Sequence, residues 1–186
     1  MTYLTGLQRA RRIEVNGEAT YAAAARWTRS RDHRARWQVL ADLETRMKDR
    51  VTAEIMARGG VAVERTLDIR AGRVIGTVIA ALPWRMMLWG LRFVTRRTTH
   101  FWERLEAEHS DENIELLADL TAHERAQVEF AQRELAGDCD QSLEPVRALL
   151  VSEVTLKKKS LPACWSGVSV VCVVGASLNR RFGLGG

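Results

Sequence analysis

Apolar residues recur at helical spacing along most of the chain, and this pattern predicts four long helices. The predicted helices span residues 4–27, 34–58, 84–109 and 114–136. Ser30 or Asp32 is placed to cap the second helix, while Gly59-Gly60 and Gly137 are typical stops after the second and fourth. The pattern therefore predicts an all-α protein.

Residues 59–83 form a long connection between the second and third predicted helices, and they carry apolar patches of their own. The stretch from Val74 to Leu91 is apolar enough to raise the question of a membrane span. Pro83 and Arg85 interrupt it, and a spanning helix needs about 20 predominantly apolar residues. We therefore expect a crossover with a surface-lying piece. The arginines around it suit a buried crossover edged with solvated charges slightly better than an anionic membrane surface, and contact with such a surface is the alternative.

Three glutamates occupy positions where the helical period predicts core residues. Glu14 lies on the stripe of the first helix, Glu44 on that of the second and Glu124 on that of the fourth, with His123 beside it. A turn near residue 30 puts Glu14 and Glu44 at nearly one level. Since a buried charge is costly, each glutamate should find a cation, a hydrogen-bond network or a metal.

These segments resemble the ferritin-like superfamily, which includes ferritins, bacterioferritins and rubrerythrins. The resemblance rests on Glu14 followed by Tyr21 in the first helix, on ADLETRMKDR around Glu44 and on LTAHERAQVEF around Glu124. It implies an antiparallel four-helix bundle with a long crossover between helices 2 and 3. It also implies that the three glutamates bind two iron or manganese ions, with Tyr21 as a catalytic residue nearby. The implied activity is that of an oxidoreductase that handles oxygen or peroxide.

Two departures from the family pattern concern its histidines and its third helix. The family places Glu-x-x-His on two helices, and this chain has Met47 and Gln127 at the histidine positions. No acid occurs between Asp68 and Glu103, so the substitute metal ligands that the sequence offers are His100, Glu103 and His123.

A metal-free reading of the same glutamates stays open. In it the inward carboxylates pair with arginines, for which Arg11, Arg46 and Arg125 are available. The chain would then be a ferritin-like bundle that acts as a membrane-surface or protein-interaction module. Its basic, tryptophan-rich crossover would provide the contact surface.

The 186 residues suit a single bundle domain over residues 1–150, followed by a tail over 151–186 of uncertain structure. The uncharged tail stretch 161–178 is short for a spanning helix and contains proline, so a membrane anchor and a strand-like or disordered appendage both stay open. The three cysteines have no spacing typical of a disulfide framework or a zinc site, and we interpret them as free thiols.

The net charge of +5 conceals an acidic block. Residues 101–150 hold 13 acidic and 4 basic side chains, while the rest of the chain is basic. The basic part could approach anionic lipid, but no motif indicates nucleic-acid binding, and we expect none. The N-terminus lacks a secretory signal, so we expect a cytoplasmic protein, with membrane association and homo-oligomer formation left open.

Overall fold

The computed structural model describes the backbone of residues 1–159 and the side chains of residues 1–151. This part of the chain is all-helical, which confirms the predicted fold class. Its helices are α1 (Tyr3–Trp27), α2 (Arg31–Ala57), α3 (Thr66–Ala80), α4 (Trp84–Glu108), α5 (Ile114–Ala136) and α6 (Glu144–Lys159). The predicted tail stretch 161–178 lies outside the described residues, and α6 runs across the predicted boundary at residue 150.

The helix ends follow from short-range capping chemistry. The Ser30 side chain accepts a hydrogen bond from the His33 backbone and caps α2, and the Asn113 side chain does the same for Leu116 at the start of α5. Gly137 closes α5 with φ of +89°, a left-handed conformation that glycine adopts without a steric penalty. Helix α5 has the bounds that the sequence pattern predicts, whereas α2 begins at Arg31, directly after its Ser30 cap, and not at residue 34.

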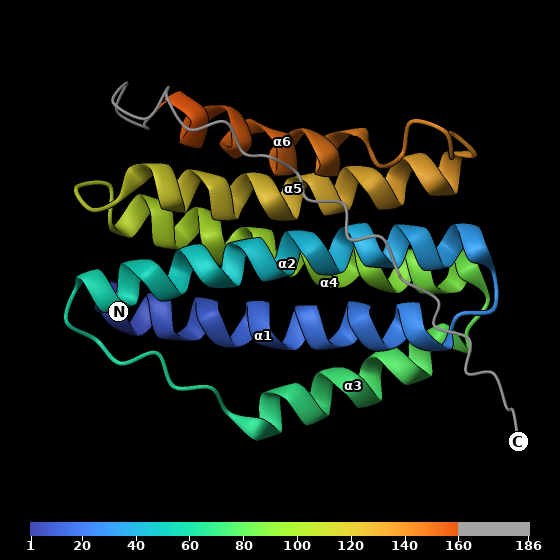
Figure 1. Ribbon diagram of the computed structural model, residues 1–186, viewed down its shortest axis with the longest axis horizontal. Helices are drawn as coiled ribbons and strands as arrows, with labels where there is room; N and C mark the ends of the chain where they lie inside the picture. Colours follow the sequence, from blue (N-terminus) through green and yellow to red (C-terminus); the bar gives the residue numbers. More distant parts are fainter. Residues whose placement is uncertain (160–186) are drawn as a thin grey trace, which may run out of the picture.

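The long helices run along the same direction of the molecule (Figure 1). Helix α1 packs against α2, and α4 packs against α5. Helix α6 covers the outer side of α5 and also contacts α2, while α3 lies against α1 at the opposite edge (Figure 1). Each of the long helices α1, α2, α4 and α5 therefore has a buried face turned toward the others.

Helix α3 lies within the predicted crossover and meets α1 through two glycines. A Cβ atom on Gly72 would lie 2.4 Å from the carbonyl oxygen of Asn16, and one on Gly76 would lie 2.1 Å from that of Thr20. Since any larger residue would collide with the α1 backbone, the glycines permit a close helix–helix approach. They are the buried residues of α3.

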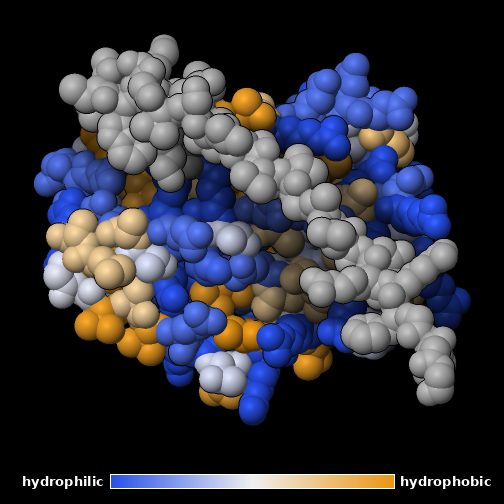
Figure 2. Space-filling view, in the orientation of Figure 1, coloured by the Kyte–Doolittle hydropathy of each residue, from blue (hydrophilic) through white to orange (hydrophobic). Residues whose placement is uncertain are grey.

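Most apolar side chains of α3 are exposed, which agrees with a surface-lying piece of the crossover and not with a fully buried one, although Ile79 packs against the core. Val74 is 64 % exposed and Phe93 on the neighbouring α4 is 63 % exposed. Other exposed apolar residues of the two helices are Leu67, Ile75, Val78, Met86, Trp89 and Val94. In Figure 2 hydrophobic residues gather along the lower edge, where Figure 1 shows α3. We call the eight exposed apolar residues of α3 and α4 the apolar face: Leu67, Val74, Ile75, Val78, Met86, Trp89, Phe93 and Val94.

The apolar face does not belong to a membrane-crossing segment in the part of the chain described. No helix there is both long enough and apolar enough to traverse a bilayer. Guanidinium groups pack on the aromatic rings of the face, with Arg92 over Trp89 at 5.2 Å and Arg97 over Phe93 at 5.9 Å.

The core consists of two apolar clusters. One surrounds Trp37, Leu40, Leu88 and Phe130, and the other surrounds Leu7, Val51, Leu105, Leu117 and Leu120. Along α1, α2 and α5, the residues of the two clusters are separated by buried polar positions. The core is thus divided by a polar layer.

Candidate metal centre

The polar layer contains five buried side chains from three helices. We define it as Glu14 on α1, Glu44 on α2, and His123, Glu124 and Gln127 on α5. Their positions follow from helical spacing, because each lies three or four residues from a core apolar residue on the same helix. The sequence prediction that Glu14, Glu44 and Glu124 are buried is confirmed.

Glycine allows Glu44 to approach α1 closely. A Cβ atom on Gly17 would lie 2.2 Å from Glu44 Oε2 and 2.7 Å from Glu44 Cδ. Any side chain at position 17 would occupy the space that the carboxylate now fills. Gly17 therefore lets the Glu44 carboxylate lie against the α1 backbone, one turn from Glu14.

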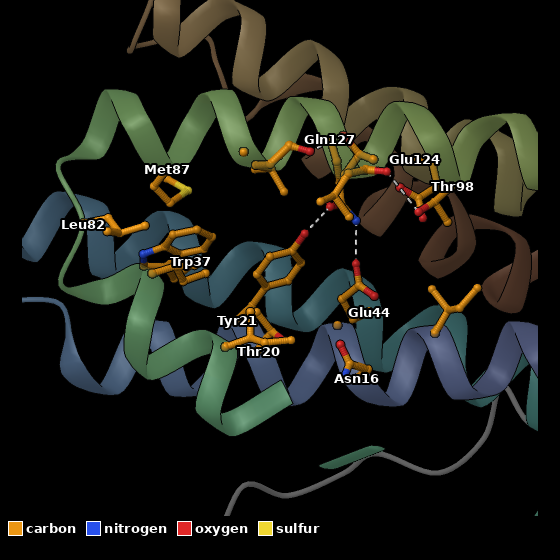
Figure 3. Close-up of a pocket in the computed structure, with 18 of the residues that line it drawn as sticks. Asn16, Thr20, Tyr21, Trp37, Glu44, Leu82, Met87, Thr98, Glu124 and Gln127 are labelled. Carbon is orange, nitrogen blue, oxygen red and sulfur yellow. Dashed lines mark hydrogen bonds between the residues drawn. The ribbon is translucent and has the colours of Figure 1, made fainter. Parts of the chain in front are cut away.

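A chain of hydrogen bonds holds Glu44 from the side of α5. Tyr21 donates its hydroxyl proton to Gln127 Oε1 at 2.5 Å, and Gln127 Nε2 donates to Glu44 Oε1 at 2.5 Å (Figure 3). His123 Nε2 lies 2.9 Å from the same Glu44 oxygen. Tyr21 therefore reaches Glu44 through Gln127, and its predicted catalytic role stays a prediction.

Glu14 has no such support. Both of its carboxylate oxygens are buried without a hydrogen-bond partner, and so is Nδ1 of His123. The closest approach between these groups is 3.8 Å, from His123 Nδ1 to Glu14 Oε2. Buried polar atoms are nearly always satisfied in proteins, so three orphaned atoms that face one another indicate a missing partner.

Burial and the mutual charges of the polar layer shift the pKa values of Glu14, Glu124 and His123. Burial raises the pKa of Glu14 well above its ordinary value, and the charges of Glu44 and Glu124 add to this rise while His123 opposes it. Burial also raises the pKa of Glu124 to about 7. Burial alone would lower the pKa of His123, but the Glu14 and Glu44 carboxylates outweigh it and raise that pKa to about 10.

The donor atoms of Glu14, Glu44 and His123 fit a single cation. One ligand atom from each residue lies within 4.8 Å of the other two. Metal–ligand bonds to carboxylate oxygen and imidazole nitrogen are about 2.0–2.2 Å, so only a small contraction would bring all three to one ion. Two carboxylates and one imidazole are a donor set that suits iron, manganese or zinc.

Glu124 is next to this group but has a different partner. Trp102 on α4 donates its indole proton to Glu124 Oε1 at 3.3 Å. The Glu124 carboxylate is buried and lies on the same face of α5 as Gln127 (Figure 3). It is adjacent to the proposed ligands without being one of the three whose donor atoms converge.

His100 and Glu103 lie on the surface, so the prediction that they approach the glutamates is wrong. They pair with each other at 3.2 Å, and Glu103 also accepts a hydrogen bond from Arg125 at 2.7 Å. The inward face of α4 at this level carries Thr95 and Thr99, whose hydroxyls donate to carbonyls of their own helix. The α4 stripe of Leu88, Leu91, Thr95, Trp102 and Leu105 has helical spacing and excludes both residues.

Two of the arginines considered as partners for the buried glutamates pair with other groups instead. Arg11 donates to Thr52 and to the carbonyl of Val63, and Arg125 donates to Glu103. Sequence reasoning missed the role of Gln127, which it treated as a lost histidine. The signal was present, since Gln127 lies four residues after His123 on the inward face of α5.

Comparisons of the chain with protein-family models, with curated proteins and with solved structures find no match, so the case for its function rests on the geometry of the polar layer.

Proposed function

We propose that the chain is a ferritin-like protein that binds one iron or manganese ion at Glu14, Glu44 and His123 and uses it as an oxidoreductase of oxygen or peroxide. The observation that carries the proposal is the set of orphaned atoms, both oxygens of Glu14 and Nδ1 of His123. Leaving a buried polar atom unsatisfied costs about 1–3 kcal/mol. A cation would satisfy all three atoms at once.

The arrangement of the helices supports the ferritin-like part of the proposal. Helices α1, α2, α4 and α5 would form the antiparallel four-helix bundle, and residues 58–83 with α3 would be its long crossover. The carboxylates come from the first and second helices and the histidine from the last, as in a family site that has lost some of its ligands.

One ion suits the residues better than the two that the family resemblance implies. A two-ion site draws ligands from all four helices of the bundle. Here α4 offers Thr95 and Thr99 at the inward face, and their hydroxyl protons are committed to backbone carbonyls. Three converging donors leave open coordination positions on a single ion, as a catalytic site requires.

A bound iron or manganese ion would supply one-electron redox chemistry and open positions for a small oxidant. The protein residues bind and orient. Glu14 and Glu44 would compensate positive charge in a buried site, and Gln127 with Tyr21 fixes the direction of the Glu44 carboxylate. Tyr21 is therefore assigned an orienting role.

Metal analysis of the purified chain tests this function. After anaerobic loading with Fe²⁺ or Mn²⁺ and removal of free metal, we expect about one ion per chain for the parent protein and a loss of at least about tenfold in occupancy for Glu14→Gln. The glutamine keeps the shape of the side chain and removes its charge, so the fold should persist.

Glu18→Gln is the matched control. Glu18 lies on the same helix, one turn further, and pairs with Lys48 at 2.7 Å outside the polar layer. Its variant should bind as much metal as the parent. Equal metal content in the Glu14 and Glu18 variants, or none in the parent, would refute the proposed site.

The apolar face favours a second candidate function, contact with an anionic membrane surface. Exposed apolar side chains on α3 and α4 are flanked by arginines, a combination typical of helices that lie on anionic lipid. Co-sedimentation with vesicles of phosphatidylcholine, with and without phosphatidylserine, tests it. We expect binding that needs phosphatidylserine and is lost in a Val74→Asp, Phe93→Asp double variant, and binding that ignores both changes would contradict it.

A further inference from the structure

A cavity of about 330 Å³ leads from the apolar face to the polar layer. Ile75 of α3 and Met86 and Val94 of α4 line it, and all three are exposed. At the other end it is lined by buried Trp37, Glu44 and Gln127. The cavity therefore opens between α3 and α4 and reaches the polar layer at Glu44, Glu124 and Gln127 (Figure 3).

The chemistry of the wall changes along the cavity. Besides the exposed residues at the opening, the apolar lining includes Ile79 and the buried Met87 and Leu91. The inner end presents the carboxylates of Glu44 and Glu124, which accept hydrogen bonds and repel anions. A volume of 330 Å³ corresponds to about eleven water molecules at roughly 30 Å³ each, far more than these few polar groups could hold in place.

We propose that this cavity binds a small amphiphile with an apolar body and a hydrogen-bond-donating head, such as a hydroxyl or amine, and that the head lies beside Glu44 and Glu124. The apolar body fills the space between α1, α3 and α4. Pockets of about 300–1,000 Å³ with apolar walls and a few convergent polar groups are typical of small-molecule sites. The ligand enters directly from the apolar face, so it need not cross a polar surface.

The proposal deepens the proposed function, and it rests on that function only for the role of the amphiphile as substrate. A molecule seated in the cavity has its head next to the proposed metal ligand Glu44. Binding itself does not require the metal. The two proposals can therefore fail separately.

Gly90 provides a way to close the cavity without disturbing the core. It lines the cavity, and a Cβ atom built on it would have no heavy atom within 4 Å. A phenylalanine at this position has room for its ring in the space that the ligand would use. Gly90→Ala is the matched control, because it also replaces the helical glycine while leaving most of the cavity open.

The test uses the full chain, before and after treatment with EDTA, and the neutral fluorophore N-phenyl-1-naphthylamine, which has an apolar body and one N–H donor. We expect saturable binding of one molecule per chain, about tenfold weaker in Gly90→Phe and nearly unchanged in Gly90→Ala. Phe93→Ser, which alters the apolar face outside the cavity, should also bind normally. Equal binding in Gly90→Phe, or loss in Phe93→Ser, would place the fluorophore on the surface and overturn the proposal.

Displacement of the fluorophore from the parent protein tests the head group without any variant. 1-Decanol, decylamine and decanoate share one apolar body and differ in the head. We expect decanol and decylamine to displace the fluorophore at concentrations about tenfold lower than decanoate, because carboxylates line the inner end. Equal or better displacement by decanoate would overturn the assignment of a donor head. Fluorophore binding in a protein that takes up no metal would remove the proposed function and leave the cavity ligand standing.

Discussion

Replacing Gly76 with alanine puts a methyl group where the α1 backbone lies. The new Cβ would be 2.1 Å from the Thr20 carbonyl oxygen and 2.7 Å from the Ala23 Cβ, whereas non-bonded atoms are at their best separation near 3.5–4.0 Å. The Thr20 carbonyl oxygen and the Ala23 Cβ are fixed by the α1 backbone, so neither atom can rotate away. The contact with the Thr20 carbonyl oxygen is more than 1 Å shorter than the best separation, so α3 must move away from α1 by about that distance.

The magnitude follows from two opposing effects. Overpacking a close contact costs about 1–3 kcal/mol. Alanine in place of glycine inside a helix returns about 1 kcal/mol. We expect Gly76→Ala to lower the free energy of unfolding by up to about 2 kcal/mol. Gly90→Ala, where a Cβ meets nothing within 4 Å, should raise it by up to about 1 kcal/mol.

Urea unfolding followed by circular dichroism measures both variants, and hydrogen exchange of the amides of residues 66–80 reports on α3 itself. Exchange in α3 should accelerate in Gly76→Ala and stay unchanged in Gly90→Ala. If Gly76→Ala were as stable as Gly90→Ala and its α3 amides equally protected, the close packing of α3 on α1 would be refuted.

Three further predictions concern the polar layer and the end of α5. Gly17→Ala pushes a methyl group against the buried Glu44 carboxylate, so metal affinity should fall about tenfold and the free energy of unfolding in urea should fall by about 1–3 kcal/mol; parent-like metal affinity would contradict the argument. Tyr21→Phe leaves the buried Gln127 oxygen without its donor and should lower the free energy of unfolding by about 1–3 kcal/mol, measured in urea. Burial would raise the pKa of Glu134, but hydrogen bonds from three side chains outweigh burial and lower that pKa. The stability that the Glu134 carboxylate contributes should therefore be complete above the ordinary glutamate pKa. It should disappear as pH falls through the lowered pKa. Urea unfolding of Glu134→Gln between pH 7 and pH 3 should show a deficit that shrinks with acid, and a constant deficit would contradict the assignment.

The helical period was sufficient to place the glutamates of three helices. Glu14, Glu44 and Glu124 lie in stripes of apolar residues, and the hairpin turn near residue 30 puts the first two at one level. Local caps such as Ser30 and Gly137 give the helix boundaries because their hydrogen bonds involve neighbours in sequence. Apolar stripes and helix caps depend on residues that are close in sequence, so they can be predicted from the sequence alone.

Two parts of the structure depend on long-range packing that the period does not describe. In α3 the buried face consists of Gly72 and Gly76, so the apolar residues that normally mark a buried face point outward instead. His123 is fully buried, although the stripe puts it near an edge, because α2 contacts this side of α5 and Glu44 lies against the imidazole. Which helix covers which edge is decided by topology.

The division of the core has a consequence for how the molecule melts. A leucine in place of each buried charged group would commonly leave a protein as stable or make it more so, by about 1–4 kcal/mol. Here the two apolar clusters are separated by the polar layer, whose buried carboxylates are stable only where positive charge or hydrogen bonds compensate them. An ion bound in the polar layer, as we propose, would stabilise the folded chain, so the thermal midpoint of unfolding would rise with the concentration of that metal.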